Sequence, residues 1–256
     1  MACGAFDILS AGALGRRRRG AYRGGVCGRF TLQTPRETLQ MLFGFSGPGP
    51  SWDAAMSERP RFNVAPTQPI LTVGTRDGAR FGDWAAWGLS FRGRLVINAR
   101  AETAFERPVF RDGVTSRRVM VPADGFIEWK KDGRRRLPYH LTRADGRPLA
   151  LGGFVRPRRD GPPTCAILTT AANEDMDGLH ERMPVILSEA DLGVWLDPAH
   201  TDRDALEALM EPAPEGTLAR TRVSERVNKV QNDDPACLEP PSEAPAAPQL
   251  GFGFGD

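Results

Sequence analysis

The sequence is poor in the residues that metal sites and disulfide frameworks require. Its 256 residues include only four cysteines and three histidines. The cysteines stand at positions 3, 27, 165 and 237, a spacing that matches no metal-ligand motif and builds no disulfide framework in a chain of this size. We therefore expect reduced thiols, no metal ion and no other cofactor.

Long hydrophobic runs are absent as well. No apolar segment approaches the roughly 20 residues that a membrane-spanning helix needs, so we expect a cytoplasmic protein with no membrane partner. The sequence contains no heptads and no large amphipathic helix, which favours a monomer. The formal net charge is only +2, so a site for a polyanion has to be a local patch.

The first 25 residues lack the pattern of a folded domain. A weakly apolar stretch, 1–14, precedes four consecutive arginines at 16–19. A secretory signal places its charges before the apolar core, which is the reverse order, whereas a basic arm for nucleic acid remains an alternative. Val26 follows, and a valine codon can also start translation in bacteria. We therefore expect residues 1–26 to be a mis-assigned or removed leader, with Val26 as the initiator.

A start at Val26 would leave Cys27 at the amino terminus once the initiator is trimmed. A terminal cysteine carries a free α-amine beside its thiol, with pKa values of about 8 and about 8.5, so both nucleophiles are partly deprotonated near neutral pH. Together they can close a five-membered ring on an aldehyde. The alternative is a buried strand cysteine, because free cysteine is among the most buried residue types.

Short apolar segments of strand length alternate with Asp-Gly turns along the middle of the chain, which predicts antiparallel hairpins. The turns are Asp77-Gly78, Asp112-Gly113, Asp132-Gly133, Asp145-Gly146 and Asp160-Gly161, and the strands span 70–74, 81–89, 117–122, 126–130, 138–142, 149–155, 164–171, 184–187 and 217–223. We expect an α+β fold: a single domain over 27–240, built on an antiparallel β-barrel-like sheet with peripheral helices. Residues 241–256 are rich in Pro, Ala and Gly and are expected to be a disordered tail.

Three helices are predicted from their starting residues. Thr34, Pro35 and Glu37 have the spacing of a capping box with proline in the first turn. Ser188 could cap a second helix and Asp202 a third, since apolar residues recur at helical spacing behind each. The predicted helices are fewer than the predicted strands. We expect them to lie at the periphery of the fold.

A first polar motif follows the apolar pair at 96–97. Asn98, Arg100 and Glu102 alternate along the chain, so they share one face if the strand continues. The guanidinium is a planar donor fork suited to phosphate, and the amide adds a second donor. An ion pair between Arg100 and Glu102 that closes a loop is the alternative.

A second motif alternates an acid with large apolar residues. Glu128 lies two residues after Phe126, so in a strand both side chains face the same side. If that side is the interior or a cleft, the pKa of Glu128 rises and the carboxyl becomes a candidate acid–base group. The alternative is an exposed strand acid with Trp129 in the core.

The third motif begins with His180, one of the three histidines. Pro184 stands where a metalloprotease helix would carry its second histidine and would break that helix, so a metalloprotease is excluded. His180 instead is expected in a loop, where it could exchange protons near neutral pH. A surface histidine beside a loop-anchoring Arg182 is the alternative.

Taken together, these fragments resemble the SRAP (SOS-response-associated peptidase) domain family over nearly the whole chain from Cys27. The resemblance rests on several ordered motifs, which are Cys27-Gly28-Arg29-Phe30, Phe62-Asn63-Val64-Ala65-Pro66-Thr67, Trp87-Gly88-Leu89, Ile97-Asn98-Ala99-Arg100-Ala101-Glu102-Thr103, Gly125-Phe126-Ile127-Glu128-Trp129, His180-Glu181-Arg182-Met183-Pro184, and Val227-Asn228 with Asn232-Asp233. The segment after Leu89 departs from the family, because Ser90-Phe91-Arg92-Gly93 replaces the usual Ile-Pro.

The resemblance implies a protein that shields abasic sites in single-stranded DNA by a covalent crosslink. Cys27 would form a thiazolidine with the ring-opened sugar aldehyde, while Glu128 and His180 handle protons. The implied DNA-binding residues are Asn63, Pro66, Asn98, Arg100 and Trp129. The partner is abasic single-stranded DNA, which places the protein on the nucleoid when it is bound.

Two other functions remain open from the sequence. Cys27 could be the nucleophile of an amino-terminal hydrolase or cysteine peptidase that removes its own leader, with His180 as its base. The chain could also be a non-covalent single-strand-binding module that uses Arg100 and the basic hairpins.

Overall fold

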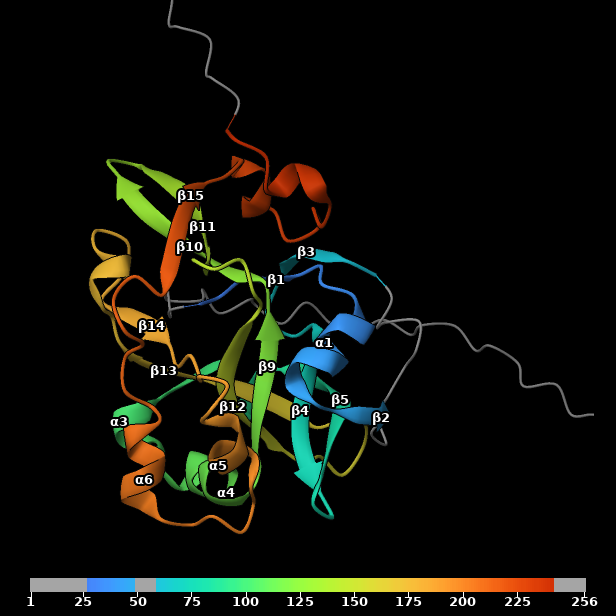
Figure 1. The fold of residues 1–256 in the computed structure, drawn as a ribbon. Helices are drawn as coiled ribbons and strands as arrows, with labels where there is room; N and C mark the ends of the chain where they lie inside the picture. The colour runs from blue at the N-terminus through green and yellow to red at the C-terminus, as the bar shows by residue number, and fades with distance from the viewer. Residues whose placement is uncertain (1–26, 49–58, 242–256) are drawn as a thin grey trace, which may run out of the picture.

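The computed structural model of the chain describes residues 27–48 and 59–241. The leader expected over 1–26 lies outside the described residues, as does the tail expected over 241–256 apart from Pro241. Strands make up the body of the fold and short helices lie at its edges (Figure 1). No helix in these two ranges is long and apolar enough to cross a membrane.

The elements follow one another in an order that mixes hairpins with single helical turns. The strands are β1 (Phe30–Leu32), β2 (Ser46–Pro48), β3 (Arg61–Val64), β4 (Pro69–Arg76), β5 (Ala79–Trp87), β6 (Leu89–Phe91), β7 (Arg94–Val96), β8 (Asn98–Arg100), β9 (Arg118–Ala123), β10 (Gly125–Asp132), β11 (Arg135–Arg143), β12 (Leu149–Arg156), β13 (Thr164–Ala171), β14 (Arg182–Pro184) and β15 (Leu218–Arg222). The helices are α1 (Arg36–Phe43), α3 (Ala101–Ala104), α4 (Pro108–Ser116), α5 (Leu192–Leu196) and α6 (Arg203–Ala208), with 3-10 turns η1 (Glu174–Met176), η2 (Glu225–Asn228) and η3 (Pro235–Cys237).

The strands pair into two principal sheets. The first has the order β15-β11-β10-β1-β3, and all of its pairs are antiparallel. The second has the order β14-β13-β12-β9-β4-β5-β2, and β5 also pairs with β13 through Thr164 opposite Ala86 and Cys165 opposite Trp87. The expected antiparallel barrel-like sheet is therefore only partly met. The chain forms separate sheets, and β13 has parallel partners in β5 and β8.

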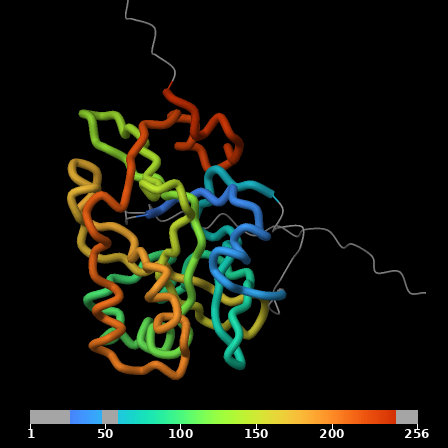
Figure 2. The backbone as a smooth tube through the Cα atoms, viewed as in Figure 1, coloured from blue at the N-terminus to red at the C-terminus, as the bar shows by residue number. Residues whose placement is uncertain are grey.

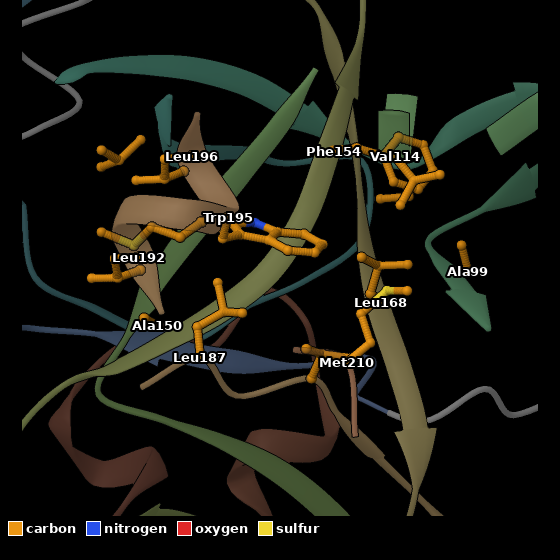
Figure 3. Packing of buried hydrophobic residues seen from close by; sticks show 14 of the residues in the cluster. Ala99, Val114, Ala150, Phe154, Leu168, Leu187, Leu192, Trp195, Leu196 and Met210 are labelled. Carbon is orange, nitrogen blue, oxygen red and sulfur yellow. The ribbon is translucent and has the colours of Figure 1, made fainter. Parts of the chain in front are cut away.

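Two large buried clusters fill the space between the sheets and helices. One surrounds Trp195 of α5, whose ring lies among Leu187, Leu192 and Leu168 (Figure 3). The indole N–H donates to the carbonyl of Val119 at 2.9 Å, so the buried polar atom of this side chain is satisfied. The other cluster includes Cys27, Phe30 and Trp87, and it is the one that meets the candidate site described below.

Three of the five Asp-Gly pairs form the predicted hairpin turns. Asp77 and Gly78 join β4 to β5 and have φ values of 52° and 77°, the two positive values that a type I′ turn requires. The pairs at 132–133 and 160–161 join the antiparallel neighbours β10 to β11 and β12 to β13. The pair at 145–146 joins β11 to β12, which lie in different sheets, so the hairpin predicted there is wrong. Local turn chemistry therefore set these connections, because a tight turn between two apolar strands has few backbone solutions.

The fifth pair, Asp112-Gly113, was wrongly predicted to be a turn. It lies inside α4, which packs against β12. A Cβ added to Gly113 would overlap the ring of Phe154, a residue that is almost fully buried. The glycine is thus needed for close approach between helix and strand, a requirement that only the tertiary contact reveals.

Of the three predicted helix caps, one is confirmed by the structure and two are not. Asp202 caps α6 by accepting from the backbone N–H groups of Asp204 and Ala205. Thr34 does not cap α1, because its hydroxyl donates to the carboxylate of Asp124 at 2.5 Å and the helix begins one residue later without a side-chain cap. Ser188 lies before α5 but donates to Asp191.

We expect Gly113→Ala to destabilise the protein although alanine favours a helix. The added methyl group has to displace the buried ring of Phe154, which overpacks the core and costs about 1–3 kcal/mol. Urea denaturation monitored by circular dichroism measures the change. Asp112→Ala, on the exposed side of the same helix, is the control and should leave stability nearly unchanged; equal stability of both variants would contradict the packing argument.

Candidate active site around Cys27

Cys27 lies just before β1, in the core cluster that includes Phe30 and Trp87. Its exposed fraction is 0%. Its φ of 51° is in the left-handed region, which is uncommon for a residue with a side chain. The cysteine is therefore held in an unusual backbone conformation inside the protein rather than presented on a strand.

The backbone nitrogen of Cys27 donates a hydrogen bond to Glu128. The distance from the nitrogen to Oε1 is 2.5 Å. Glu128 lies on β10, adjacent to β1, and strand alternation points it to the same interior side as Phe126. The predicted inward orientation is what the structure has, and the exposed-acid alternative is wrong because the residue is only 5% exposed.

Burial raises the pKa of Glu128 to about 7, because the interior disfavours the charged carboxylate. The hydrogen bond from Cys27 and the positive charge of Arg136 act in the opposite direction and favour the charged form. The carboxyl can therefore gain and lose a proton near neutral pH. Such a group is suited to general acid–base work, since its pKa lies near the operating pH.

The thiol of Cys27 differs from the sequence-based expectation. Burial, together with the negative charge of Glu128, raises the pKa of the thiol well above its usual value. The sulfur is therefore protonated at neutral pH instead of partly ionised. A nucleophilic attack by this sulfur needs a base beside it to take the proton, and Glu128 is the acid–base group in contact with the same residue.

His180 lies in the predicted loop, between η1 and β14, and is half-buried. Its Nδ1 accepts a hydrogen bond from the backbone N–H of Arg182 at 3.0 Å, so in the neutral ring the proton is on Nε2. Burial lowers the pKa of His180, while Glu181 opposes this effect. No hydrogen bond joins His180 to Cys27 or Glu128 within the described ranges.

Asn98 and Arg100 both lie on β8, beside β13, so they share a face as predicted. Arg100 is exposed and Asn98 is half-buried. Glu102 does not continue that face, because the strand ends and Glu102 lies in α3. Its carboxylate pairs with both terminal nitrogens of Arg182 instead of with Arg100. The alternative of an ion pair between Arg100 and Glu102 is therefore wrong, because Arg182 engages the carboxylate.

Asn63, which was predicted as a DNA-binding residue, makes internal hydrogen bonds in the structure. The side chain is fully buried. Its Nδ2 donates to the backbone carbonyls of Val227, Lys229 and Asn232, at 3.1, 3.1 and 2.7 Å. Its Oδ1 accepts from Arg29. The amide is thus used to hold the chain at 227–232 against β3.

Asp233 is a second anchor of the same segment, and the sequence analysis assigned it no role. Its carboxylate accepts from the backbone N–H groups of Phe62 and Asn63 at 2.6 and 2.9 Å and pairs with Arg61 at 2.6 Å. The carboxyl-terminal part of the chain consequently lies beside β3 (Figure 2). The motif Asn232-Asp233 was the available signal, but its partner is 170 residues away in the sequence.

Trp129 projects from the opposite face of β10 to Glu128, because successive side chains of a strand alternate. Its indole N–H donates to Oδ1 of Asn228 at 2.6 Å. The guanidinium carbons of Arg29 and Arg136 lie 5.8 and 5.6 Å from the ring centroid. The ring is half-buried and packs with Ile127, so it is only partly in the core.

Pro66 is half-buried at the turn between β3 and β4, and this turn adjoins Trp87. The backbone N–H of Thr67 donates to the carbonyl of Trp87 at 2.8 Å, and the N–H of Trp87 donates to that of Gln68 at 2.9 Å. Trp87 in turn contacts Phe30, with ring centroids 5.2 Å apart. The turn that carries Pro66 is therefore linked to the segment of Cys27 indirectly, through the hydrogen bond of Thr67 to Trp87 and the ring contact of Trp87 with Phe30.

The three described cysteines, at 27, 165 and 237, are free and buried, as expected for reduced thiols. Among the described residues, no group of three or more His, Cys, Asp or Glu side chains could hold a metal ion. The site therefore consists of a cysteine, a carboxyl group and their polar surroundings.

We expect Asn63→Ala to lower stability, because it leaves the carbonyl of Asn232 without this donor and Arg29 without its Oδ1 acceptor. The carbonyls of Val227 and Lys229 each lose one of two donors. Leaving buried polar groups unsatisfied costs about 1–3 kcal/mol each at most sites, so the loss should exceed that of Asn228→Ala, which removes one exposed bond. Thermal and urea unfolding of both variants test this. A variant at position 63 with wild-type stability but without DNA binding would contradict the structural role.

The chain is similar to known proteins over most of its length. The family profile described as "SOS response associated peptidase (SRAP)" matches residues 26–230. The chain is 35% identical over 227 residues to Abasic site processing protein YoqW of Bacillus subtilis (strain 168), covering 84% of this chain and 99% of YoqW. It is 30% identical over 224 residues to Abasic site processing protein YedK of Escherichia coli (strain K12), covering 84% of this chain and 100% of YedK.

The fold also has a solved counterpart. A crystal structure of a protein from Bacteroides thetaiotaomicron matches with a TM-score of 0.72 at 21% sequence identity, covering 84% of this chain and 99% of that chain. At this identity the match shows the fold alone. The profile match and the identity to curated relatives together show that the chain belongs to the SRAP family.

Proposed function

We propose that this chain shields abasic sites in single-stranded DNA by a covalent thiazolidine crosslink through Cys27. The observation that carries the proposal is the 2.5 Å contact between the nitrogen of Cys27 and the buried carboxyl of Glu128. It brings an acid–base group with a pKa of about 7 to the atom that would be the α-amine. Relatives of the chain are named abasic site processing proteins, which supports the same substrate.

The first chemical step is attack of the Cys27 α-amine on the aldehyde carbon of the ring-opened deoxyribose. Glu128 accepts the proton that the nitrogen loses, the former aldehyde oxygen takes up a proton from solvent water, and the product is a carbinolamine. Glu128 then returns a proton to the hydroxyl, which leaves as water and gives an iminium ion. One carboxyl can serve both directions because its pKa lies near neutrality.

The second step is ring closure by the thiol of the same residue. The sulfur attacks the iminium carbon, its proton passes to Glu128, and a five-membered thiazolidine forms. The overall change consumes one aldehyde, one amine and one thiol and releases one water. Burial of the thiol explains why a neighbouring base is needed, since the sulfur alone stays protonated.

The remaining predicted site residues hold the DNA or move a proton in this proposal. Asn98 and Arg100, side by side on β8, bind the phosphate next to the abasic sugar, and exposure of Arg100 leaves it accessible. Pro66 and Trp129 support the flanking nucleotides. His180, with its proton on Nε2, donates that proton to the sugar oxygen. Asn63 acts indirectly, because its amide holds the segment at 227–232 in place.

The proposal requires an unblocked amine, so residues 1–26 have to be absent from the active form. It also places the protein in the cytoplasm, on the nucleoid when bound, as a monomer. The domain that does this work spans 27–240. A peptidase that frees its own amino terminus draws less support, because the thiol is protonated and no hydrogen bond links it to His180 in the described ranges.

The decisive experiment uses an oligonucleotide with one abasic site and a denaturing gel. The chain that begins at Cys27 should be retained as an adduct, whereas the 1–256 chain should not, because its Cys27 nitrogen is acylated. Cys27→Ser keeps the amine but lacks sulfur, so it should give only a Schiff base that borohydride has to trap. Absence of an adduct from the Cys27-start chain would overturn the proposal, and self-cleavage of the 1–256 chain would favour the peptidase.

We expect Glu128→Gln to slow adduct formation by about 100-fold, at the lower end of general acid–base contributions. Glutamine keeps the shape of the side chain but neither accepts nor returns a proton. Single-turnover rates on the abasic oligonucleotide measure the effect, and native binding to intact DNA should be retained. A rate within threefold of wild type would remove Glu128 from the mechanism.

The same substitution also gives a pH-dependent stability difference. The pKa of Glu128 is higher in the folded chain, about 7, than the usual 4.5, so folding is favoured by protonation and wild-type stability falls as pH rises from about 4.5 to about 7. The glutamine of the variant does not titrate. We expect Glu128→Gln to gain stability relative to wild type between pH 5 and pH 8, measured by urea unfolding; a pH-independent difference would contradict the raised pKa.

A further inference from the structure

Glu102 and Arg182 form an ion pair to which the proposed chemistry gives no part. Glu102 lies in the first turn of α3, two residues after Arg100. Arg182 begins β14, two residues after His180. Both carboxylate oxygens accept from the guanidinium, Oε2 from Nη2 at 2.8 Å. The pair therefore joins the segment of the proposed phosphate-binding arginine to the segment of the proposed proton donor.

The guanidinium of Arg182 also reaches the strand between these two segments. Its Nη2 donates to the backbone carbonyl of Thr169 at 2.5 Å. Thr169 lies on β13, opposite Arg100 of β8 on one side and opposite Pro184 of β14 on the other. The side chain of Arg182 is only 14% exposed. One arginine thus ties β14 to β13 and to α3, the helix that follows β8.

The strand that carries Arg182 has little other support. β14 has three residues and stands at the end of its sheet, where it pairs with β13 alone over 169–171. A short segment at an edge opens locally at a low cost in free energy, because few hydrogen bonds and contacts have to break. The bonds from the guanidinium therefore add substantially to what holds this strand in place.

The ring of His180 takes its orientation from the same strand. Its Nδ1 accepts from the backbone N–H of Arg182 at 3.0 Å, and no other hydrogen bond to the ring occurs within the described ranges. A displacement of residue 182 consequently turns the ring and moves the proton on Nε2. The carboxylate of Glu102 acts on that proton through two steps, the guanidinium and the backbone of Arg182.

Charge links the same residues. Burial lowers the pKa of His180, and Glu181 opposes this effect. Arg182 and Lys131 lower the pKa further. The hydrogen bond from Arg182 lowers the pKa of Glu102, so this carboxylate is charged at neutral pH and offsets the positive charge that His180 experiences. The remaining charged side chains that line the hollow beside the ring are Glu174, Asp177, Glu215 and Arg220.

We propose that Glu102 is a positioning residue for His180. By holding the guanidinium of Arg182, its carboxylate fixes β14 and keeps the Nε2–H of the imidazole directed at the sugar oxygen. Glu102 itself touches neither the sugar nor the phosphate. The inference rests on the proposed function, which gives His180 its role.

A double-mutant cycle tests the proposal, with single-turnover adduct formation by chains that begin at Cys27. We expect Glu102→Gln to slow the reaction about 10- to 100-fold, because misplacing a reacting group by about 1 Å costs up to about 100-fold. In a His180→Gln background the same substitution should change the rate by less than about threefold, since its effect passes through the missing ring. Equal losses in the two backgrounds would overturn the proposal.

Binding and a conservative variant distinguish positioning from general damage. Reversible binding to intact single-stranded DNA should not weaken in Glu102→Gln, because the substitution removes a negative charge near Arg100. Glu102→Asp keeps the charge on a shorter side chain and should give an intermediate rate. Weaker DNA binding that accounts for the whole loss of rate would assign Glu102 to the DNA site and contradict the proposal.

Glu106→Gln is the matched control. Glu106 lies two residues after α3 and pairs with Arg203, and its side chain is 50% exposed, as is that of Glu102. Neither residue of this pair forms a hydrogen bond or ion pair with 179–182 in the part of the chain that the structure describes. Its loss should leave adduct formation unchanged, and circular dichroism shows whether each variant is folded. A loss of rate equal to that of Glu102→Gln would contradict a specific role.

An NMR titration of the ring nitrogens of His180 in the 1–256 chain separates this inference from the proposed function. Glu102→Gln should lower the pKa of His180, because the charge of Arg182 is no longer offset, whereas Glu106→Gln should not change it. If wild type forms no adduct but the titration shifts as expected, the positioning role stands and the crosslinking proposal fails. An unshifted titration in Glu102→Gln would overturn the positioning role.

Discussion

Burial of one carboxyl group beside the backbone nitrogen of Cys27 is the constraint on which the candidate site depends. Glu128 would face away from Cys27 if β10 were turned by one residue, since strand alternation would then direct it to the other side of the sheet. Pairing of β10 with β1 instead directs it inward, where its pKa rises to about 7. The same burial keeps the neighbouring thiol protonated, so the acid–base group and the sulfur depend on each other.

A second constraint acts from the carboxyl-terminal part of the chain. Asn63 and Asp233 join β3 to the segment at 227–233 through backbone and side-chain hydrogen bonds. That segment supplies Asn228, which holds Trp129 on the outward face of the hairpin. Residues at the two ends of the domain therefore position a ring in its middle. A buried asparagine that organises a distant loop can resemble a ligand-binding residue in sequence, although its contacts are internal.

Much of the fold could be predicted because it depends on local chemistry. The Asp-Gly hairpin turns and the strands between them follow from backbone preferences and alternation, which need no distant partner. Short strands such as β1, β3 and β8 were missed, because three or four residues carry no periodic signal. The turn predicted at Asp112-Gly113 was wrong because its glycine is required by a tertiary contact, the packing of α4 on Phe154, and not by a local turn.

The sequence by itself determined the family, the candidate nucleophile and the acid that serves it, since these lie in short motifs whose residue types are specific. Tertiary structure decided which face each residue occupies and what it touches. Only the folded chain brings Glu128 to the nitrogen of Cys27, turns Asn63 inward and joins Glu102 to Arg182. The physical reason is that burial and hydrogen bonding depend on partners 80 to 170 residues away, and no local pattern encodes those distances.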